Sequence, residues 1–421
     1  MAEIKAFKPL RYTRKAGRIQ NNVCPPYDIV NSELRRELCE KSPYNLIRLE
    51  LPEGDDNVKY REAKRLLDEF VSKGILEKDQ REGIFIYEEE FTLKGKTHLF
   101  DGLVCLCKTY DFSEQIVLPH EETLSKAKKD RFDLMSETFC NFSSVYSLFN
   151  DEKGYIQNII DEYKKDIPLA EFTDDEDITH RLWKISDKNT INDIVSFFAG
   201  KQLFIADGHH RYETANQFNN YCVENNIEAD SGYVLMTIVD MDSPGLTVLP
   251  THRVIVNMDV DAEKLASAAG EDFDISFYND FNKVEETLNT FSDRKAFALY
   301  TGKGGFWLFV LKNEQYLKAS VINDLDVSVL HDLVLEKHLG IDKANMASQK
   351  NLIYTRSINE AKEYVDTQKA SAAFILNPTR VGQIKAVAAA GKKMPQKSTY
   401  FYPKLITGLV INQFGEGQKR S

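Results

Sequence analysis

The stretch "QLFIADGHHRYETA", residues 202–215, carries the pattern that decides the fold around it. An apolar, strand-like run ends in Asp207 and Gly208, and glycine allows the backbone to turn tightly. The residues that follow predict a helix with one buried face, because four residues recur at three- and four-residue steps. These residues are Tyr212, Ala215, Phe218 and Cys222. The stretch therefore predicts a strand, a tight turn and a helix.

The sequence after this helix predicts more strands. "YVLMTIVDM", residues 233–241, and "LTVLPTHRVIV", residues 246–256, are rich in β-branched and apolar residues. A strand–helix–strand order with short connections is typical of an α/β unit. We predict an α/β (mixed α+β) fold with a central α/β unit at 171–260, flanked by mixed α/β regions at 1–170 and 261–421. The strand with His252 and Arg253 is expected to neighbour the central motif.

Composition narrows the class of protein. The 421 residues have a net charge of −11, so nucleic acid is not expected as a partner. No apolar run reaches the roughly 18 residues that a membrane span requires, so we expect no membrane partner. The start of the chain has no apolar segment typical of a signal peptide. The expected location is the cytoplasm.

The first turn of the predicted helix is unusually basic, with His209, His210 and Arg211 in sequence. The free N–H groups of a helix start already carry about half a positive charge, and a cation there costs roughly 0.3–1 kcal/mol. A bound anion reverses the sign of that cost, and phosphate suits such a turn. We predict a phosphate site in which Arg211 is the charged clamp and a histidine donates or carries a proton. The alternative is that Asp207 neutralises Arg211 locally and that the two histidines are merely exposed.

A metal site at this turn is a weaker interpretation. Adjacent histidines on a helix point about 100° apart, whereas His209 and Glu213 are one turn apart and suit a shared metal. The sequence contains no HExxH, GxxxxGK[ST] or GxGxxG motif. The metal therefore stays unknown, and a nucleotide, if bound, is not held by a P-loop or a dinucleotide fingerprint.

Three other stretches combine charge and hydroxyl groups. "PHEETLSKAKKDRFDLM", residues 119–135, is either a solvated helix or a site. In the second interpretation Glu121 or Glu122 is a base or Mg²⁺ ligand and Lys129 and Arg131 bind an anion. Arg253 follows in "LPTHRVI", residues 249–255. A further anion site is predicted in "KKMPQKSTYFYPK", residues 392–404, at Lys397, Ser398 and Thr399.

Five motifs in this order resemble one family. They are "CPPYDIV", "HEETLSKAKKDR", "IADGHHRYETA", "LPTHRVI" and "MPQKSTYFYPKLITGLV". Together they span most of the chain and look like domain-of-unknown-function family 1015. The resemblance implies a shared fold and leaves the activity open.

The central motif has a second, more distant resemblance. "ADGHHRYETA" is similar to the strand–turn–helix of the ParB and sulfiredoxin superfamily, whose members bind nucleotide phosphates at this turn and include enzymes that phosphorylate free serine. Asp207, Gly208, His210 and Arg211 match that turn. This chain has His209 where sulfiredoxin has a cysteine.

These observations lead to one function and two alternatives. We predict a phosphotransferase that uses ATP or ADP with Mg²⁺ on a small hydroxylated metabolite, with free serine or phosphoserine as the best candidate. The candidate catalytic residues are Glu121, Glu122, His209 and His210. The candidate phosphate- or nucleotide-binding residues are Asp207, Gly208, His210, Arg211, Lys129, Arg131, Arg253, Lys397, Ser398 and Thr399. The alternatives are a phosphatase of a small phosphate ester and a non-catalytic module that senses nucleotide or phosphate. The sequence leaves the oligomeric state open.

Overall fold

The computed structural model describes residues 1–55, 58–121, 123, 125–312, 314–395 and 397–419. Internal contacts divide the chain into two compact units. Unit 1 comprises Met1–Pro119, Thr123–Leu246 and Pro403–Ser421, and unit 2 comprises His120–Glu122 and Thr247–Tyr402. The predicted central region at 171–260 therefore contributes to both units.

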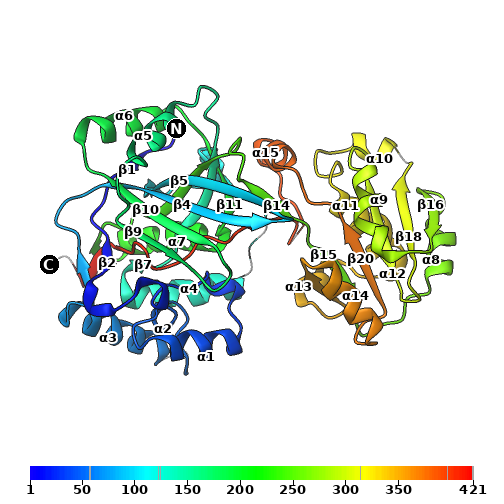
Figure 1. Cartoon of the computed structure of the whole chain (residues 1–421), viewed down its shortest axis with the longest axis horizontal. Coiled ribbons are helices and arrows are strands. Elements are labelled where there is room, and N and C mark those ends of the chain that lie inside the picture. The colour runs from blue at the N-terminus through cyan, green and yellow to red at the C-terminus, as the bar shows by residue number, and fades with distance from the viewer. Residues whose placement is uncertain (56–57, 122, 124, 313, 396, 420–421) are drawn as a thin grey trace. The chain divides into compact units, whose positions relative to one another are not determined.

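Unit 1 is built on a mixed sheet, drawn in Figure 1. Its strand order is β6-β11-β8-β13-β5-β4-β10-β9, and β1 pairs with β5. The pairs β6–β11 and β8–β13 are parallel and the others are antiparallel. The strands are β1 (Ile4–Lys5), β4 (Ile84–Leu93), β5 (Lys96–Lys108), β6 (Val117–Leu118), β8 (Val145–Phe149), β9 (Ala170–Thr173), β10 (Thr179–Ile185), β11 (Leu203–Asp207) and β13 (Tyr233–Asp240).

Helices of unit 1 pack into two apolar cores. Alternate residues of β5, such as Leu103 and Cys105, point into one core together with residues of α5, α6 and α7, including Phe218. A second core lies among α1 to α4 and includes Leu67 and Leu134. The helices are α1 (Ser32–Lys41), α2 (Ile47–Glu50), α3 (Lys59–Ser72), α4 (Ser125–Thr138), α5 (Tyr155–Tyr163), α6 (Lys188–Phe198) and α7 (His209–Glu224).

Three short strand pairs complete unit 1. They are β2 (Leu10–Tyr12) with β3 (Leu76–Lys78), β7 (Cys140–Asn141) with β22 (Asn412–Gln413), and β12 (Ile227–Ala229) with β23 (Gly415–Lys419). The last residues of the chain thus return to the unit that contains the first. This return brings residues after Pro403 to the sheet that holds the central motif.

The predicted strand–turn–helix–strand is confirmed as β11, α7 and β13. Strand β8 lies between β11 and β13, antiparallel to β11 and parallel to β13. The apolar face of α7 packs as the spacing predicted, with Tyr212, Ala215, Phe218 and Cys222 at most 2% exposed. The local pattern therefore identified the element that carries the site.

Unit 2 has an antiparallel sheet with the order β16-β18-β17-β20-β15-β19. Its strands are β15 (His252–Ile255), β16 (Phe273–Tyr278), β17 (Ala296–Tyr300), β18 (Phe306–Leu311), β19 (Leu352–Thr355) and β20 (Ala372–Leu376), and β14 (Thr247–Leu249) pairs separately with β21 (Tyr400–Tyr402). The prediction that the His252 strand neighbours the central motif is wrong, because β15 pairs with β19 and β20 of this sheet.

One helix of unit 2 departs from the regular pattern. The helical segment that begins at Asp326 is not a continuous α-helix, because α11 (Asp326–Leu330) continues into a π-helix, His331–Glu336, and then α12 (Lys337–Leu339). The remaining helices are α8 (Ala262–Ala269), α9 (Val284–Thr290), α10 (Glu314–Lys318), α13 (Lys343–Ser348), α14 (Ile358–Asp366) and α15 (Val381–Ala389). The two units confirm a mixed α/β fold. Among the described residues, none of the helices is long and apolar enough to cross a membrane.

Candidate functional site

The turn between β11 and α7 begins the helix without a capping side chain. Gly208 is the N-cap residue with φ +88°, a left-handed conformation that favours glycine. It gives the helix no side-chain cap. A Cβ atom at Gly208 would lie 2.8 Å from Nε of Arg211, so a larger residue would displace the arginine. The helix start therefore has no capping side chain, and the side chain of Arg211 lies against Gly208.

Asp207 lies between two cations. Its Oδ2 accepts from Arg211 and its Oδ1 accepts from Lys404, and Arg211 also donates to the carbonyl oxygen of Ser144. The side chains of Arg211 and Lys404 are 10% and 8% exposed. Burial raises the pKa of Asp207, but Lys404 and Arg211 outweigh it and hold that pKa well below its usual range. Burial opposes the charge of Arg211, yet Asp207 raises its pKa. Asp207 and Arg211 are therefore both charged at neutral pH.

The two histidines of the turn lie differently. His209 is 6% exposed and its charge would lower the pKa of Asp207, whereas His210 is half-buried. Glu213, one turn further along α7, accepts from Nζ of Lys128 at 2.7 Å and from Thr123 Oγ1 at 2.8 Å. Within the described ranges, no three His, Cys, Asp or Glu side chains gather to hold a metal ion. The geometry of Glu213 is that of an ion pair between α4 and α7.

Arg131, in α4, is part of a second buried group in unit 1. Its guanidinium carbon lies 3.9 Å from the ring centroid of Tyr27, and it donates to the backbone oxygen of Glu50 at 2.8 Å. Asp130 Oδ2 accepts from Arg131 Nε at 3.0 Å and from its second terminal nitrogen at 2.5 Å. Burial opposes the charge of Arg131, but Glu50, Tyr27 and Asp130 raise its pKa. The predicted anion ligand thus already has carboxylate partners.

Lys129 lies elsewhere on α4. Its side chain is 77% exposed and pairs with Asp133 one turn away, at 2.6 Å. Neighbouring positions on a helix point in different directions, so Lys128 reaches Glu213 while Lys129 faces solvent. The structure thus brings Lys128, rather than Lys129, to α7.

Tyr27 and Asp28 interact with the two arginines of unit 1. The ring of Tyr27 lies against Arg131, and the charge of Asp28 acts on Arg211. Both residues lie in a short 3₁₀-helix, Tyr27–Ile29, after the double proline. Asp28 is exposed, and the negative charges of Asp28 and Glu50 help to raise the pKa of Arg211. The sequence analysis includes this loop among the family motifs, as "CPPYDIV", but does not place it in the site. Its signal was the rigid proline pair directly before a tyrosine and a carboxylate.

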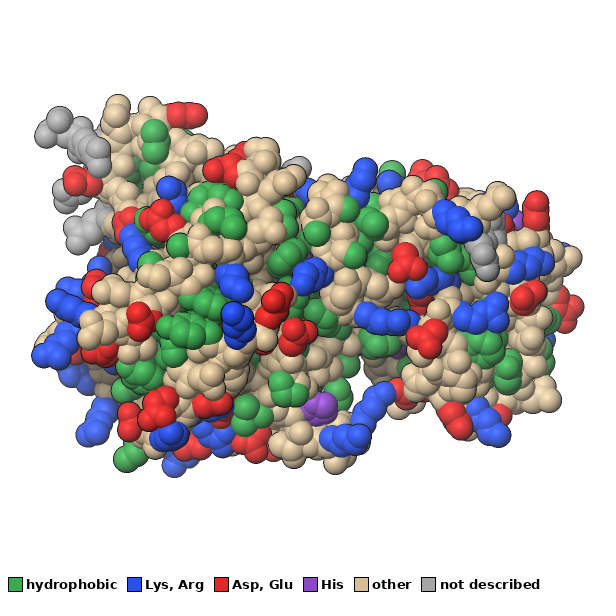
Figure 2. Space-filling view, turned by 90° about the horizontal axis from the view of Figure 1, so that it is seen from above, with side chains coloured by type: hydrophobic (Ala, Val, Ile, Leu, Met, Phe, Trp, Pro, Cys, Tyr) green, Lys and Arg blue, Asp and Glu red, His purple; other side chains and the backbone are tan. Residues whose placement is uncertain are grey.

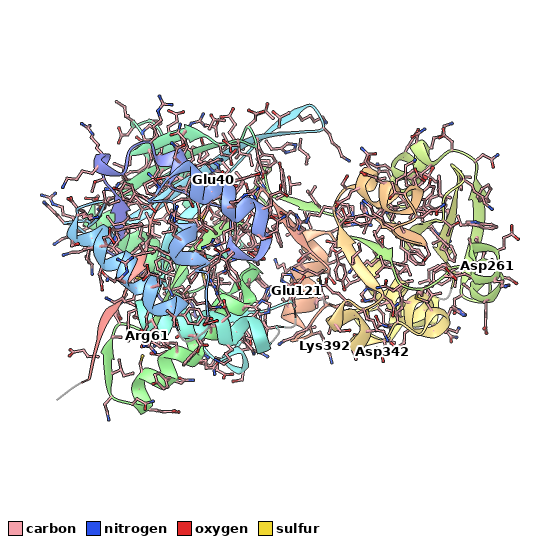
Figure 3. The ribbon with its side chains drawn as sticks, turned by 90° about the horizontal axis from the view of Figure 1, so that it is seen from below. Glu40, Arg61, Glu121, Asp261, Asp342 and Lys392 are labelled. Carbon is pink, nitrogen blue, oxygen red and sulfur yellow. The ribbon has the colours of Figure 1, made fainter. Side chains whose placement is uncertain are left out.

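A separate group of predicted residues lies in unit 2. Thr399 donates to Glu121 Oε1 from its backbone N–H at 3.3 Å and from its hydroxyl at 3.1 Å. His120 Nε2 lies 2.9 Å from the same hydroxyl. Because the Thr399 hydroxyl donates its proton to Glu121, it must accept a hydrogen bond from Nε2 of His120. Figure 3 labels Glu121. Glu122, the other predicted carboxylate, lies outside the described residues.

Arg253 is the most deeply buried cation of unit 2, at 1% exposed. It donates to the carbonyl oxygens of Thr251 and, at 3.1 Å, Lys397, and its Nε lies 3.3 Å from Nε2 of His331. Burial lowers the pKa of Arg253 to about 10. Lys397 thus contributes its backbone to this contact, and its side chain is exposed. Ser398 is 4% exposed, and its hydroxyl donates to the carbonyl oxygen of Pro395.

The predicted site residues therefore form two groups, one in each unit. Asp207, Gly208, His209, His210 and Arg211 lie together at the start of α7, with Arg131 in the same unit. A second set lies in unit 2 and comprises Glu121, Arg253, Lys397, Ser398 and Thr399. Sequence reasoning missed Lys404, although it lies in a quoted motif, because nothing local to residue 404 relates it to residue 207.

The surface charge is mixed on the face drawn in Figure 2. Lysine and arginine side chains alternate there with aspartate and glutamate, and no large area of one sign is visible. Nucleic-acid-binding surfaces gather their basic residues on one face. This face lacks that feature.

The fold and the site define a mixed α/β protein with a buried, ion-paired helix start. The chain belongs to the family described as "Protein of unknown function (DUF1015)", whose model matches residues 4–328. No curated protein matches the sequence.

Three solved structures show weak similarity. "Free serine kinase in complex with AMP" has a TM-score of 0.37 and 14% identity, covering 68% of this chain and 83% of that one. A conserved hypothetical protein from Pyrococcus furiosus has a TM-score of 0.34 and 14% identity, covering 68% and 87%. "SbnI with C-terminal truncation from Staphylococcus aureus" has a TM-score of 0.34 and 10% identity, covering 71% and 84%. These scores are too low to carry an argument about fold or function.

Proposed function

We propose that the start of α7 binds a phosphate group of a nucleotide and that the protein transfers a phosphoryl group to the hydroxyl of a small metabolite. The observation that carries this proposal is the charge balance at the turn. Arg211 and Lys404 supply two positive charges and Asp207 one negative, so these three groups sum to one positive charge (2 − 1). A phosphate is the anion that both this charge and a helix N-terminus favour.

The donors at the turn support the same ligand. A guanidinium has five N–H donors, and the bonds of Arg211 to Asp207 and Ser144 use two of them. The helix dipole adds about half a positive charge at the first turn of α7. Asp207 accepts from both cations and keeps Arg211 charged and oriented. The turn is therefore arranged before a ligand arrives.

Phosphoryl transfer requires mainly positioning and charge neutralisation, with one group that orients the acceptor hydroxyl. Asp28 suits that role, because it is an exposed carboxylate whose charge acts on Arg211. Glu121 and Glu122 belong to unit 2 and stay predictions from the sequence. Mg²⁺ is held by one or two carboxylates together with substrate phosphates, so Asp28 is also the residue of unit 1 that would contact such an ion. ATP or ADP as the nucleotide and serine as the acceptor are proposed from the resemblance of the central motif.

Calorimetric titration of ATP into the full chain tests the phosphate site. Arg211→Met keeps a long side chain but removes the charge, and we expect it to weaken ATP binding at least tenfold. Arg61→Met is the matched control, because Arg61 is exposed on α3 of the same unit, and it should bind as the unaltered protein does. Figure 3 labels Arg61. Equal affinity in the two variants would overturn the assignment, provided that circular dichroism shows both folded.

Product analysis then separates the functions. Formation of ADP and phosphoserine from ATP and serine supports the phosphotransferase. Phosphate release from phosphoserine without nucleotide would indicate a phosphatase instead. Tight nucleotide binding without turnover on a panel of hydroxylated metabolites would indicate a sensing module.

A further inference from the structure

Unit 2 contains a cavity of about 140 Å³ beside the irregular helix. An engineered cavity of roughly 150 Å³ in another protein holds one benzene molecule. The cavity therefore has room for an apolar group of about one aromatic ring. All its lining residues belong to unit 2, and none is part of the α7 turn.

The π-helix His331–Glu336 forms one wall. It contributes His331, Asp332 and Glu336 to the lining. A π-helical turn is rare and is frequently found at functional sites. The irregularity of this helix thus coincides with the cavity rather than lying at a distant position.

Three lining residues have a buried polar atom without a hydrogen-bond partner among the described residues. These atoms are Ser328 Oγ, His331 Nδ1 and Tyr354 Oη. Because Arg253 donates to Nε2 of His331, the proton of the neutral ring is on Nδ1, which is then a buried donor with no acceptor. Unsatisfied buried polar groups are costly, and native proteins keep few of them. Their concentration at one cavity points to a ligand with polar groups.

The remaining lining residues combine an apolar floor with a charged rim. Met346 and Met394 are buried, and methionine adapts to ligands of varied shape. At the rim, Glu336 is an exposed carboxylate, and Lys343 and Lys393 are exposed ammonium groups. Figure 3 labels Asp342 and Lys392, the residues directly before these two lysines. The rim thus offers both signs of charge above an apolar pocket.

We propose that this cavity binds a free α-amino acid with an apolar side chain. The side chain would fill the space over Met346 and Met394. The ammonium group would face Asp332 and Glu336, and the carboxylate would accept hydrogen bonds from Ser328, His331 and Tyr354 and face Lys343 at the rim. This inference does not rest on the function proposed above, because serine has no apolar group that fills the cavity.

Calorimetry on the full chain tests the proposal with L-phenylalanine and L-methionine as probes. At least one should bind saturably. 3-Phenylpropionate lacks the ammonium group and phenethylamine lacks the carboxylate, so each should bind at least tenfold more weakly than L-phenylalanine. L-Serine should bind this site no better than glycine. Absence of saturable binding of both probes would overturn the proposal.

Two rim variants locate the binding. Lys343→Ala and Glu336→Gln alter exposed side chains, so both should fold, and each should weaken probe binding at least fivefold. Lys350→Ala is the matched control, because Lys350 is exposed in the same unit and does not line the cavity. If both rim variants bind the probe as tightly as the control does, the cavity is not the site. Nucleotide binding by these variants should be unaltered, which separates this test from that of the proposed function.

Discussion

Arg211 in unit 1 and Arg253 in unit 2 are both buried, but different groups surround them. Arg211 shares the carboxylate of Asp207 with a second cation, Lys404. The hydrogen bonds of Arg253 to Thr251, Lys397 and His331 all go to neutral acceptors. The pKa shifts follow this difference, because the pKa of Arg211 is raised by Asp207 and burial lowers that of Arg253 to about 10.

The comparison shows two ways of keeping a cation inside a protein. A carboxylate offsets the loss of hydration directly, but removing it then leaves charge without compensation. Carbonyl oxygens offset the loss of hydration through hydrogen bonds, and losing any one of these bonds costs less than losing a carboxylate partner. A turn with paired charges can also exchange partners with an incoming anion. This difference supports the proposal that phosphate binds at Arg211 rather than at Arg253.

The largest expected effect is that of Asp207→Asn. It leaves Arg211 and Lys404 buried without their shared carboxylate, and we expect a loss of about 3–5 kcal/mol in the stability of unit 1. Hydrogen-exchange mass spectrometry measures the free energy of opening separately for peptides of each unit. Asp193→Asn is the control, because Asp193 is exposed on α6. It should leave the protection of β11 and α7 unchanged.

The difference in opening free energy between the unaltered protein and Asp207→Asn should depend on pH, which gives a second test. The pKa of Asp207 is lower in the folded chain than in the unfolded chain, so its contribution is present above the unfolded pKa and is lost as the pH falls. The gap between the unaltered protein and Asp207→Asn should therefore narrow below about pH 4, the ordinary range of an aspartate. A gap that stays constant down to pH 3 would show that Asp207 is not held in its charged form by the two cations.

The sequence was informative about α7 because its signals are local. An apolar strand, a glycine and a helical stripe within 21 residues specify β11 and α7, and the structure bears out each of them. The partner Lys404 lies 197 positions from Asp207, so no local pattern relates them. The ion pair follows from the return of the chain to unit 1 after Pro403, which is a property of the whole fold.

Arg253 was harder to place for the same reason. Its strand follows β13 closely in sequence, and a neighbouring position in the same sheet was the simplest expectation. The chain instead leaves unit 1 after Leu246, and β15 pairs with strands that come about 100 residues later, β19 and β20. The sequence does not distinguish the π-helix from an α-helix, because its apolar residues 333 and 334 continue the ordinary helical period of residues 329 and 330 in α11.

A moderate effect is expected from Arg253→Met, which keeps much of the side-chain volume. It removes the donors to the carbonyl oxygens of Thr251 and Lys397, and a buried acceptor left without a donor costs about 1–3 kcal/mol. We expect a loss of about 2 kcal/mol in the opening free energy of β15, smaller than the effect of Asp207→Asn on β11. Hydrogen exchange on the same samples gives both values.

Arg294→Met controls for the loss of an exposed arginine in unit 2. The comparison between the two arginines fails if Arg253→Met costs as much as Asp207→Asn. Arg253 would then depend on charge compensation rather than on its neutral acceptors.

The smallest effect compares two adjacent lysines of α4. Lys128 pairs with Glu213 of α7, and the two side chains are 29% and 18% exposed, whereas Lys129 is 77% exposed and pairs along its own helix. Exposed pairs of the second kind contribute under about 0.5 kcal/mol. Lys128→Ala should therefore cost about 1 kcal/mol and Lys129→Ala less than half of that, measured as the opening free energy of α7.

High salt gives this last comparison its control, because salt screens exposed pairs more strongly than partly buried ones. The cost of Lys129→Ala should vanish at 1 M NaCl, while part of the cost of Lys128→Ala should persist. Equal costs for the two lysines would mean that Glu213 gains nothing from its contact with α4. Glu213 would then be as available to a metal or a ligand as the sequence alone suggested, and the ion pair would no longer argue against that interpretation.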